Sequence, residues 1–238
     1  MSTPFSPVQH QINAYFPPST HPYRLFESDI HRIVNRHTNV LDIGCGRTAP
    51  VLRTLIGKAG RLQGIDCVDF ALEQPGLELI RNSFELMGDI DDSSVDLAYS
   101  RSVMEHVRDV DRAFSELYRV LKPGGVYLFL TPNVWDYATL VSRAVPNRFH
   151  GPIVRLVEGR DPDDVFPAYY RANSITAIGA LAQRRGLQVE RMEYLGQYPA
   201  YFTFNRVAFY LAGVYERTIR RAANLHFLRG WISGVLRK

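Results

Sequence analysis

The sequence predicts an α/β fold, a three-layer α/β/α sandwich whose mostly parallel sheet has about seven strands. Short apolar runs alternate with segments of helical periodicity over residues 40–130, and this alternation is typical of parallel strands joined by crossover helices. The run at 126–130 is apolar throughout, as expected of a strand that is covered on both faces. A length of 238 residues suits one such domain with additional segments.

The first half of the chain supplies the first three strands of this pattern. Residues 1–22 are rich in Pro, Ser and Thr and predict an irregular arm. Apolar residues at helical spacing then predict a helix over 23–36. The elements expected next are a strand at 40–43, a glycine-rich turn with a helix at 49–56, a second strand at 62–65 and a weaker third strand at 84–87.

The second half continues the alternation and then interrupts it. The elements expected are a fourth strand at 95–100, a helix at 112–121 that a Pro-Gly-Gly signal ends, a fifth strand at 126–130, a helix at 174–185 and a strand at 187–194. After Asn133, about forty residues carry aromatic residues and prolines without strand periodicity. We expect a final strand or hairpin after Gly186, and residues 200–238 look mostly helical.

We therefore expect one domain with five parts. These parts are an N-terminal arm and helix (1–38), a core (39–133), an insertion or lid (134–172), a last helix and strand (173–195) and a basic, largely helical tail (196–238). The tail holds seven basic side chains against one acid, a net charge of +6, whereas the whole chain carries +4. The positive charge is therefore a property of the tail.

Composition excludes several classes of protein. Hydrophobic residues make up 46% and charged residues 22%, which is ordinary for a globular chain. Two cysteines are too few for a disulfide framework and lack the spacing of a metal site. The N-terminus has no basic segment followed by an apolar run, and no stretch of about 18 apolar residues occurs. We therefore expect a cytoplasmic protein without a resident metal.

The most informative segment is the glycine-rich turn after the first predicted strand. Asp42 lies near the end of that strand, and Gly44 and Gly46 alternate at the turn into a helix. Glycines at such a turn let the backbone approach a ligand where a β-carbon would collide. Twenty residues after Gly46, the second predicted strand is followed by Asp66, whose carboxylate can accept hydrogen bonds from both ribose hydroxyls of an adenosine group.

Two cofactor classes are compatible with these glycines. Gly44, Gly46 and Ala49 satisfy the dinucleotide spacing G-x-G-x-x-A, so a nicotinamide-dependent oxidoreductase is one alternative. Such a loop binds a pyrophosphate at a helix N-terminus, and Asp42 would repel that anion. The same carboxylate suits a ligand that carries an ammonium and a sulfonium cation.

Four further motifs accompany the glycine turn. They are GID at the end of the second strand, Gly88-Asp89-Ile90, VDLAYSRSVMEHV and RVLKPGGVYLFLTPN. In this order and spacing, from about Val40 to Asn133, the chain resembles the class I S-adenosylmethionine-dependent methyltransferases, particularly those like the ubiquinone and menaquinone biosynthesis enzymes. The resemblance implies a Rossmann-like fold whose core binds S-adenosyl-L-methionine.

The resemblance also assigns roles by position. Asp42, Gly44 and Gly46 would surround the methionine moiety and Asp66 would hold the ribose. Asp89 would accept from the adenine amino group, and the amide of Ile90 would meet a ring nitrogen. Residues beside these positions complete the expected cofactor-binding set, namely Cys45, Cys67, Ser100 and Arg101. From the residues alone, an acid of a surface turn is the lesser alternative for Asp89.

Two histidines are candidates for the base that an oxygen or carbon acceptor would need. His106, in the Glu105-His106-Val107 element, follows the fourth strand near the edge where α/β proteins bind ligands. A histidine that only orders this loop is the alternative. His150 lies in the insertion that we expect to cover the site. Methyl transfer itself is an in-line displacement for which the cofactor supplies the reactive bond.

The tail leaves two partners open. Its last residues place apolar side chains on one face of a predicted helix, namely Leu225, Leu228, Trp231, Ile232, Val235 and Leu236. A basic amphipathic helix predicts peripheral contact with an anionic inner-leaflet membrane through residues 200–238. The alternative is a helix that packs on the core or in a homodimer interface.

The acceptor expected is a small molecule or a lipid- or polysaccharide-linked group. We do not expect nucleic acid, because the chain has no element for flipped bases and its basic residues lie in the tail. A non-catalytic homologue that binds the cofactor or a membrane remains the alternative to an enzyme.

Overall fold

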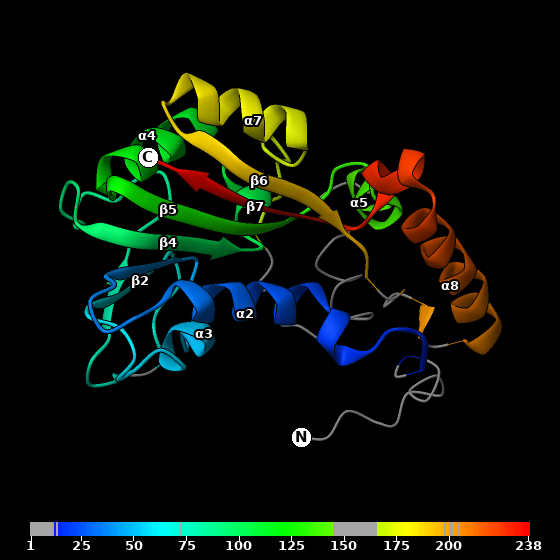
Figure 1. Cartoon of the computed structure of the whole chain (residues 1–238), viewed down its shortest axis with the longest axis horizontal. Coiled ribbons are helices and arrows are strands. Elements are labelled where there is room, and N and C mark those ends of the chain that lie inside the picture. Colours follow the sequence, from blue (N-terminus) through cyan, green and yellow to red (C-terminus); the bar gives the residue numbers. More distant parts are fainter. Residues whose placement is uncertain are drawn as a thin grey trace. The chain divides into compact units, whose positions relative to one another are not determined.

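A computed structural model describes residues 12, 14–71, 73–144, 166–197, 199, 202–203 and 205–238. The chain forms two compact units. Unit 1 comprises Met1–Leu25, Pro132–Pro167 and Tyr194–Trp231, and unit 2 comprises Phe26–Thr131, Ala168–Glu193 and Ile232–Lys238. Unit 2 contains most of the sheet, which is described first (Figure 1).

A seven-stranded, mostly parallel sheet confirms the predicted fold class. Its strands are β1 (Val40–Ile43), β2 (Leu62–Asp66), β3 (Glu78–Arg81), β4 (Val95–Arg101), β5 (Leu121–Pro132), β6 (Gln188–Leu195) and β7 (Trp231–Arg237). They lie in the order β3-β2-β1-β4-β5-β7-β6, and β1 to β5 pair in parallel. The chain order reverses at β1, so the carboxyl ends of β1 and β4 form the switch point where such sheets bind ligands.

Strand β7 is the antiparallel member of the sheet. Lys238, which follows β7, pairs with Gly124 and Gly125 at the start of β5 through backbone hydrogen bonds of 2.8 and 3.0 Å. The end of β7 therefore meets the beginning of β5. The final strand or hairpin expected after Gly186 is present as two neighbouring strands, β6 and β7, which residues 196–230 separate in the chain.

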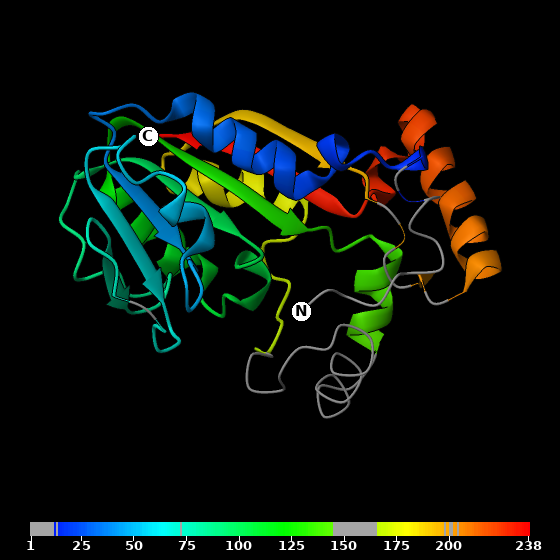
Figure 2. The same cartoon turned by 90° about the horizontal axis from the view of Figure 1, so that it is seen from below.

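Helices cover both faces of the sheet in unit 2 (Figures 1 and 2). Helices α2 (Pro22–Ile33) and α3 (Pro50–Arg53) lie on one face, and α4 (Val110–Val120) and α7 (Ile175–Arg184) lie on the other. Each of the latter two begins at a capping side chain, since Asp109 accepts from the Arg112 amide and Ser174 accepts from the Ala177 amide. The other elements that the described residues form are η1 (Pro18–Thr20), η2 (Met104–His106), α5 (Tyr137–Ala144), α8 (Arg206–Arg221) and η6 (Ala223–Leu228).

Three predicted elements need correction. The third strand is Glu78–Arg81 and not 84–87, because Phe84 and Met87 are buried as parts of a turn that holds only an isolated bridge between Ser83 and Leu86. The helix predicted at 49–56 is confined to Pro50–Arg53. The first error arises because burial at 84–87 belongs to a turn, and the second because the helical burial of Ala49, Leu52 and Leu55 continues past the short helix.

The C-terminal segment is also different from the prediction. Residues 231–237 form strand β7 and not the end of an amphipathic helix. Ile232 and Leu236 are fully buried, because β7 lies between β5 and β6. The membrane contact predicted from this part of the tail is therefore wrong in its structural basis. Within the described residues, no helix combines the length and apolar character needed to cross a bilayer.

Candidate functional site

The glycine turn after β1 is the centre of the candidate site. Gly44 and Gly46 have φ angles of +76° and +72°, which favour glycine. A β-carbon on Gly44 would lie 2.3 Å from Val103 Cγ2, so this glycine lets the turn pack closely on the segment after β4. A β-carbon on Gly46 would meet nothing within 4 Å. Gly46 therefore borders open space into which a ligand could extend.

Asp66 is fixed against this turn. Its Oδ2 accepts the Gly46 amide at 2.7 Å, and its Oδ1 accepts the Val68 amide at 3.2 Å. The segment after β2 is held from the other side, since the Ala71 amide donates to the Arg47 carbonyl at 2.9 Å. Each carboxylate oxygen of Asp66 keeps a further lone pair for a ligand hydroxyl.

Asp42 is the buried charge of the site. Only 4% of its surface is exposed, and Tyr99 Oη donates to its Oδ2 at 3.0 Å. Burial is the main cause that raises the pKa of Asp42 to about 7, while the Tyr99 hydrogen bond and the Arg101 charge oppose that rise and Asp66 adds to it. A bound cation would favour the ionised form of Asp42, whereas a pyrophosphate would oppose it.

Asn82 is a candidate residue that sequence reasoning missed. It follows β3 directly, and its amide donates to the Asp66 carbonyl at 2.9 Å, so it lies beside Asp66 at the same edge of the sheet. Its Nδ2 donates to Asp89 Oδ2 at 2.8 Å. Asp89 itself is exposed. The signal was available only once the third strand was assigned to residues 78–81.

Ile90, whose amide the resemblance places at an adenine ring nitrogen, ends a tight turn. Its amide donates to the Met87 carbonyl at 2.9 Å, and its side chain is buried. The turn that ends at Ile90 therefore already uses the N–H group expected to meet a ring nitrogen. The carboxylate of Asp89 and the amide group of Asn82 are the polar groups that this region presents.

Ser100 and Arg101 end β4 next to the glycine turn and are engaged with protein groups. Ser100 is buried and its Oγ lies 2.5 Å from Tyr127 Oη. Arg101 Nη1 donates to Glu27 Oε1 at 2.9 Å. Arg101 therefore acts on the site at least through its charge, which lowers the pKa of Asp42.

The two cysteines of the expected set differ in environment. Cys45 is buried within the turn, and burial raises the pKa of its thiol. Its Sγ would lie 2.8 Å from a β-carbon on Gly64, so β2 needs a glycine there. Cys67 is exposed after Asp66. Cys45 thus packs the turn against β2, whereas Cys67 faces solvent.

His106, the first candidate base, lies in η2 after the end of β4. Its side chain is 34% exposed, and its Nε2 lies 3.9 Å from Glu105 Oε1. Glu105 is buried, its Oε2 accepts from Thr131 Oγ1 at 3.3 Å, and Thr131 Oγ1 in turn accepts from Asn173 Nδ2 at 2.7 Å. The Tyr169 and Tyr170 amides donate to the Glu105 carbonyl. His106 is therefore partly accessible on a firmly held turn, whereas His150 lies outside the described residues.

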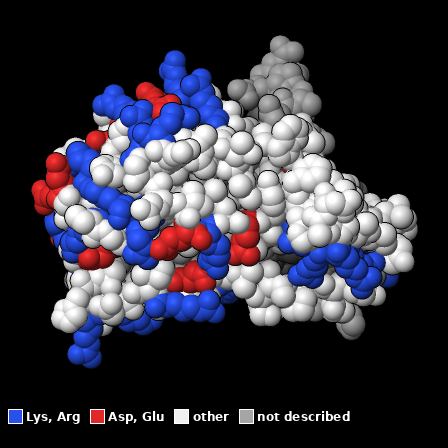
Figure 3. Space-filling model, turned by 45° about the horizontal axis from the view of Figure 1, so that its top comes forward, with Lys and Arg blue, Asp and Glu red and all other residues white. Residues whose placement is uncertain are grey.

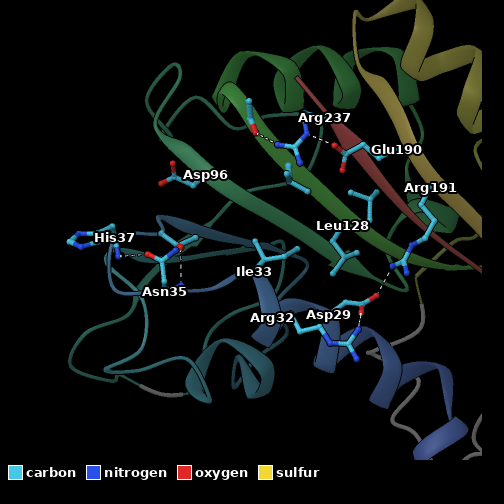
Figure 4. A pocket seen from close by; sticks show the side chains of 14 residues that line it. Asp29, Arg32, Ile33, Asn35, His37, Asp96, Leu128, Glu190, Arg191 and Arg237 are labelled. Atoms are coloured by element: carbon cyan, nitrogen blue, oxygen red, sulfur yellow. Dashed lines mark hydrogen bonds and ion pairs between the residues drawn. The ribbon is translucent and has the colours of Figure 1, made fainter.

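A separate groove of about 560 Å³ lies at the opposite, amino-terminal edge of the sheet (Figure 4). Its arginines are paired with carboxylates: Arg32 and Arg191 contact Asp29 at 3.0 and 2.6 Å, and Arg237 contacts Glu190. None of the candidate cofactor residues lines it. The groove is therefore not the site predicted from the sequence.

Comparison with known protein families finds one family that matches the segment containing this site. The family described as a methyltransferase domain matches residues 41–129, which run from β1 into β5. The match includes Asp42, both glycines of the turn, Asp66 and Asn82.

Individual curated relatives match this chain over less than half of their own length. A malonyl-[acyl-carrier protein] O-methyltransferase of Yersinia pestis is 35% identical over 113 residues, which are 42% of this chain and 41% of that protein. A sterol 24-C-methyltransferase of Pneumocystis carinii is 29% identical over 109 residues, which are 41% of this chain and 29% of that protein. The chain spans less than half the length of the curated relatives it matches.

A solved structure extends the likeness to the whole fold. The crystal structure of an S-adenosylmethionine-dependent methyltransferase from Mesorhizobium loti has a TM-score of 0.58 and 17% sequence identity. The likeness covers 89% of this chain and 96% of that one. The predicted three-layer, Rossmann-like architecture is thereby confirmed.

Proposed function

Because residues 41–129 of this chain are a methyltransferase domain of the class I S-adenosylmethionine-dependent family, we propose that the protein transfers a methyl group from S-adenosyl-L-methionine to an acceptor. One observation carries this proposal. The buried carboxylate of Asp42 lies next to the turn that contains Gly44 and Gly46. The Gly46 amide in this turn donates to Asp66 Oδ2 at 2.7 Å. This arrangement favours a cationic adenosyl ligand over a dinucleotide.

The residues at the sheet edge fit such a ligand. Asp42 and the Gly44–Gly46 turn would hold the methionine moiety, and Asp66 would accept from the ribose hydroxyls. Asn82, supported by Asp89, would meet the adenine edge, because it follows β3 immediately beside Asp66. When bound, the cofactor supplies an electrophilic methyl group on a sulfonium. The chain contributes alignment of the two reactants and exclusion of water.

The acceptor proposed is a small molecule or a lipid- or polysaccharide-linked group. A carrier-linked malonyl ester enzyme and a sterol enzyme are among the curated relatives, and their names support acceptors of small-molecule or lipid type. Neither name decides between oxygen and carbon as the acceptor atom.

Of the two candidate bases, His106 is the one that lies within the described residues, and it would take the proton from the acceptor. Its imidazole is partly exposed on η2, and Glu105 beside it is held by Thr131 and by the Tyr169 amide. A base requires such a fixed and accessible position near the reacting atoms. If His106 only orders the turn, His106→Asn would lower activity without changing how activity depends on pH.

Calorimetry with S-adenosylhomocysteine tests the cofactor assignment. We expect one site per chain, and Asp66→Ala should weaken binding by at least about 1–3 kcal/mol because it removes the acceptor of the ribose hydrogen bonds. Glu78→Gln is a control at the far end of β3, where Glu78 pairs with Arg61. Tight uptake of NAD with no heat from S-adenosylhomocysteine would refute the proposal.

A labelled cofactor can reveal the acceptor directly. Cell extract incubated with the protein and isotopically labelled S-adenosylmethionine should yield a labelled product that mass spectrometry detects. The Asp42→Asn variant is the control, because any product labelled in its presence is formed independently of this site. Cofactor binding combined with no labelled product from any extract fraction would favour a non-catalytic homologue.

A further inference from the structure

One face of α8 carries apolar side chains that are exposed in the part of unit 1 that the structure describes. Val207, Tyr210, Leu211 and Val214 are 68%, 56%, 63% and 40% exposed. Their spacing of i, i+3, i+4 and i+7 places them on one stripe of the helix. The opposite face is buried, and its residues are Phe209, Gly213, Glu216 and Ile219. The α8 helix is therefore packed on one side and apolar on the other.

The charge of α8 is of one sign on its accessible surface. Every residue of this helix is described, and it carries four arginines, namely Arg206, Arg217, Arg220 and Arg221. Its single acid, Glu216, is only 3% exposed. In Figure 3, the right-hand part of the view is largely uncharged, with blue Lys and Arg groups at its rim.

The apolar and basic residues follow one another along the stripe. Val207 to Val214 occupy its first two turns, and Arg217 and Arg221 continue it at i+10 and i+14 from Val207. The Arg217 guanidinium lies 4.7 Å from the Tyr15 ring centroid and 5.9 Å from that of Tyr210, which holds this cation beside the apolar part. The Val207–Val214 half of the stripe can therefore contact hydrocarbon, and the half with Arg217 and Arg221 can bind anions.

We propose that the outer face of α8 docks on an anionic lipid surface, with the Val207–Val214 half inserted among acyl chains and the arginines at the headgroups. An interfacial helix buries an apolar face and places its cations against anionic lipid.

Charge also distinguishes this surface from a dimer interface. A parallel pairing of two α8 stripes would place Arg217 and Arg221 opposite their own copies. An antiparallel pairing would place these arginines against the apolar half of the partner. Either arrangement carries a penalty that an anionic lipid surface does not. The proposal extends beyond methyl transfer and does not depend on it.

Flotation with phosphatidylcholine vesicles, with and without phosphatidylglycerol, tests the proposal on the full chain. We expect binding to vesicles that contain phosphatidylglycerol and its loss at high salt. Leu211→Asp should abolish flotation. Arg220→Gln with Arg221→Gln should weaken partitioning into anionic vesicles by roughly 30-fold, since each basic residue near such a surface contributes severalfold. Val189→Asp, at a residue of β6 that is 44% exposed, is the matched control and should float like the unchanged chain.

Circular dichroism and S-adenosylhomocysteine binding of each variant verify that it is folded, so a failure of lipid docking is separable from a failure of the cofactor site. Absence of flotation by the intact chain would overturn the proposal. Equal loss with Val189→Asp would also overturn it, because the effect would then not be specific to α8. A concentration-dependent dimer that Leu211→Asp dissociates, without vesicle binding, would assign the stripe to a second copy instead.

Discussion

At the scale of single residues, the state of Asp42 links cofactor binding to pH. Burial raises its pKa to about 7 in the free protein, so about half of the molecules carry a neutral Asp42 near pH 7. A cationic ligand prefers the ionised form, and its binding should therefore release protons at low pH. We expect the affinity for S-adenosylmethionine to fall roughly eightfold between pH 7.5 and pH 6, as the ionised fraction falls.

Calorimetry in buffers of different ionisation enthalpy measures this release directly. Asp42→Asn removes the titrating group and should give weaker binding that is nearly independent of pH over this range. The Tyr99 hydroxyl, Arg101 and Asp66 are the groups that act on Asp42, and all remain in that variant. Unchanged pH dependence in Asp42→Asn would show that another group titrates.

Alanine substitutions at Gly44 and Gly46 should have different effects on stability and on ligand binding. Gly44→Ala places a β-carbon 2.3 Å from Val103 Cγ2 at a positive φ, so it should lower the free energy of unfolding by more than the roughly 1–2 kcal/mol of backbone strain. Gly46→Ala bears only the strain, because its β-carbon has open space. It should instead weaken S-adenosylhomocysteine binding. Thermal denaturation and calorimetry of both variants separate the two effects.

What the sequence predicts of the site depends on local pattern. Asp42, Gly44 and Asp66 can be predicted from the sequence, because each is recognised from a strand end or a glycine spacing within one short segment. Asn82 and the Tyr99 hydrogen bond to Asp42 depend on which strands are neighbours and where β3 ends. Those facts are tertiary, and an edge strand such as β3, with an exposed residue at each end, has little hydrophobic period to reveal it.

At the scale of elements, β7 shows why a tail can be assigned to the wrong structure. Ile232 and Leu236 fit a helical spacing of four and a strand spacing of two equally well. The strand is selected by its place between β5 and β6, where Gly234 lets the chain pass the Phe129 ring closely. Short apolar runs are decided by the sheet that receives them.

This placement gives a prediction for β7. Removal of residues 231–238 should abolish cooperative unfolding of the sheet, because β7 joins β5 and β6. A single change, Ile232→Asp, should cost several kcal/mol, since it buries an unpaired carboxylate at a position with no exposed surface. Tyr210→Asp, at an exposed site of α8, should leave stability nearly unchanged. Chemical denaturation of these variants measures the contrast.

Helix α8 supplies a pH-dependent contribution to stability through Glu216. Burial is the main cause that raises the pKa of Glu216 from 4.5 to about 8; Asp136 adds to the rise, and the Gln197 backbone, Arg220 and Arg229 oppose it. A raised carboxyl pKa favours the neutral form in the folded state. The stabilising contribution is therefore full below pH 4.5 and is lost as pH rises through about 8.

Glu216→Gln keeps the shape and removes the titration. We expect this variant to match the unchanged protein near pH 4 and to be more stable near pH 9. Hydrogen exchange of α8 amides at both pH values reports on this helix separately from the sheet. A variant that is less stable at pH 9 would contradict the assignment of a neutral Glu216.

At the scale of the whole molecule, the two units have separate tasks in the present proposals. Every described candidate for the cofactor site belongs to unit 2, whereas the α8 stripe belongs to unit 1. The basic tail recognised in the sequence is divided between them, because Arg237 and Lys238 belong to unit 2 and Arg206 to Arg229 belong to unit 1. That both units form one domain stays a prediction.

Hydrogen exchange with and without S-adenosylhomocysteine tests this division. A ligand at about 100 times its dissociation constant stabilises the state that binds it by about 2.7 kcal/mol. The largest protection should therefore appear in unit 2, at the Gly44–Gly46 turn, at Asp66 to Val68 and at Asn82. Addition of anionic vesicles should instead protect α8, and Leu211→Asp should remove only that second effect. Protection that is greatest in α8 on adding S-adenosylhomocysteine would place the ligand in unit 1 and overturn the assignment of the glycine turn.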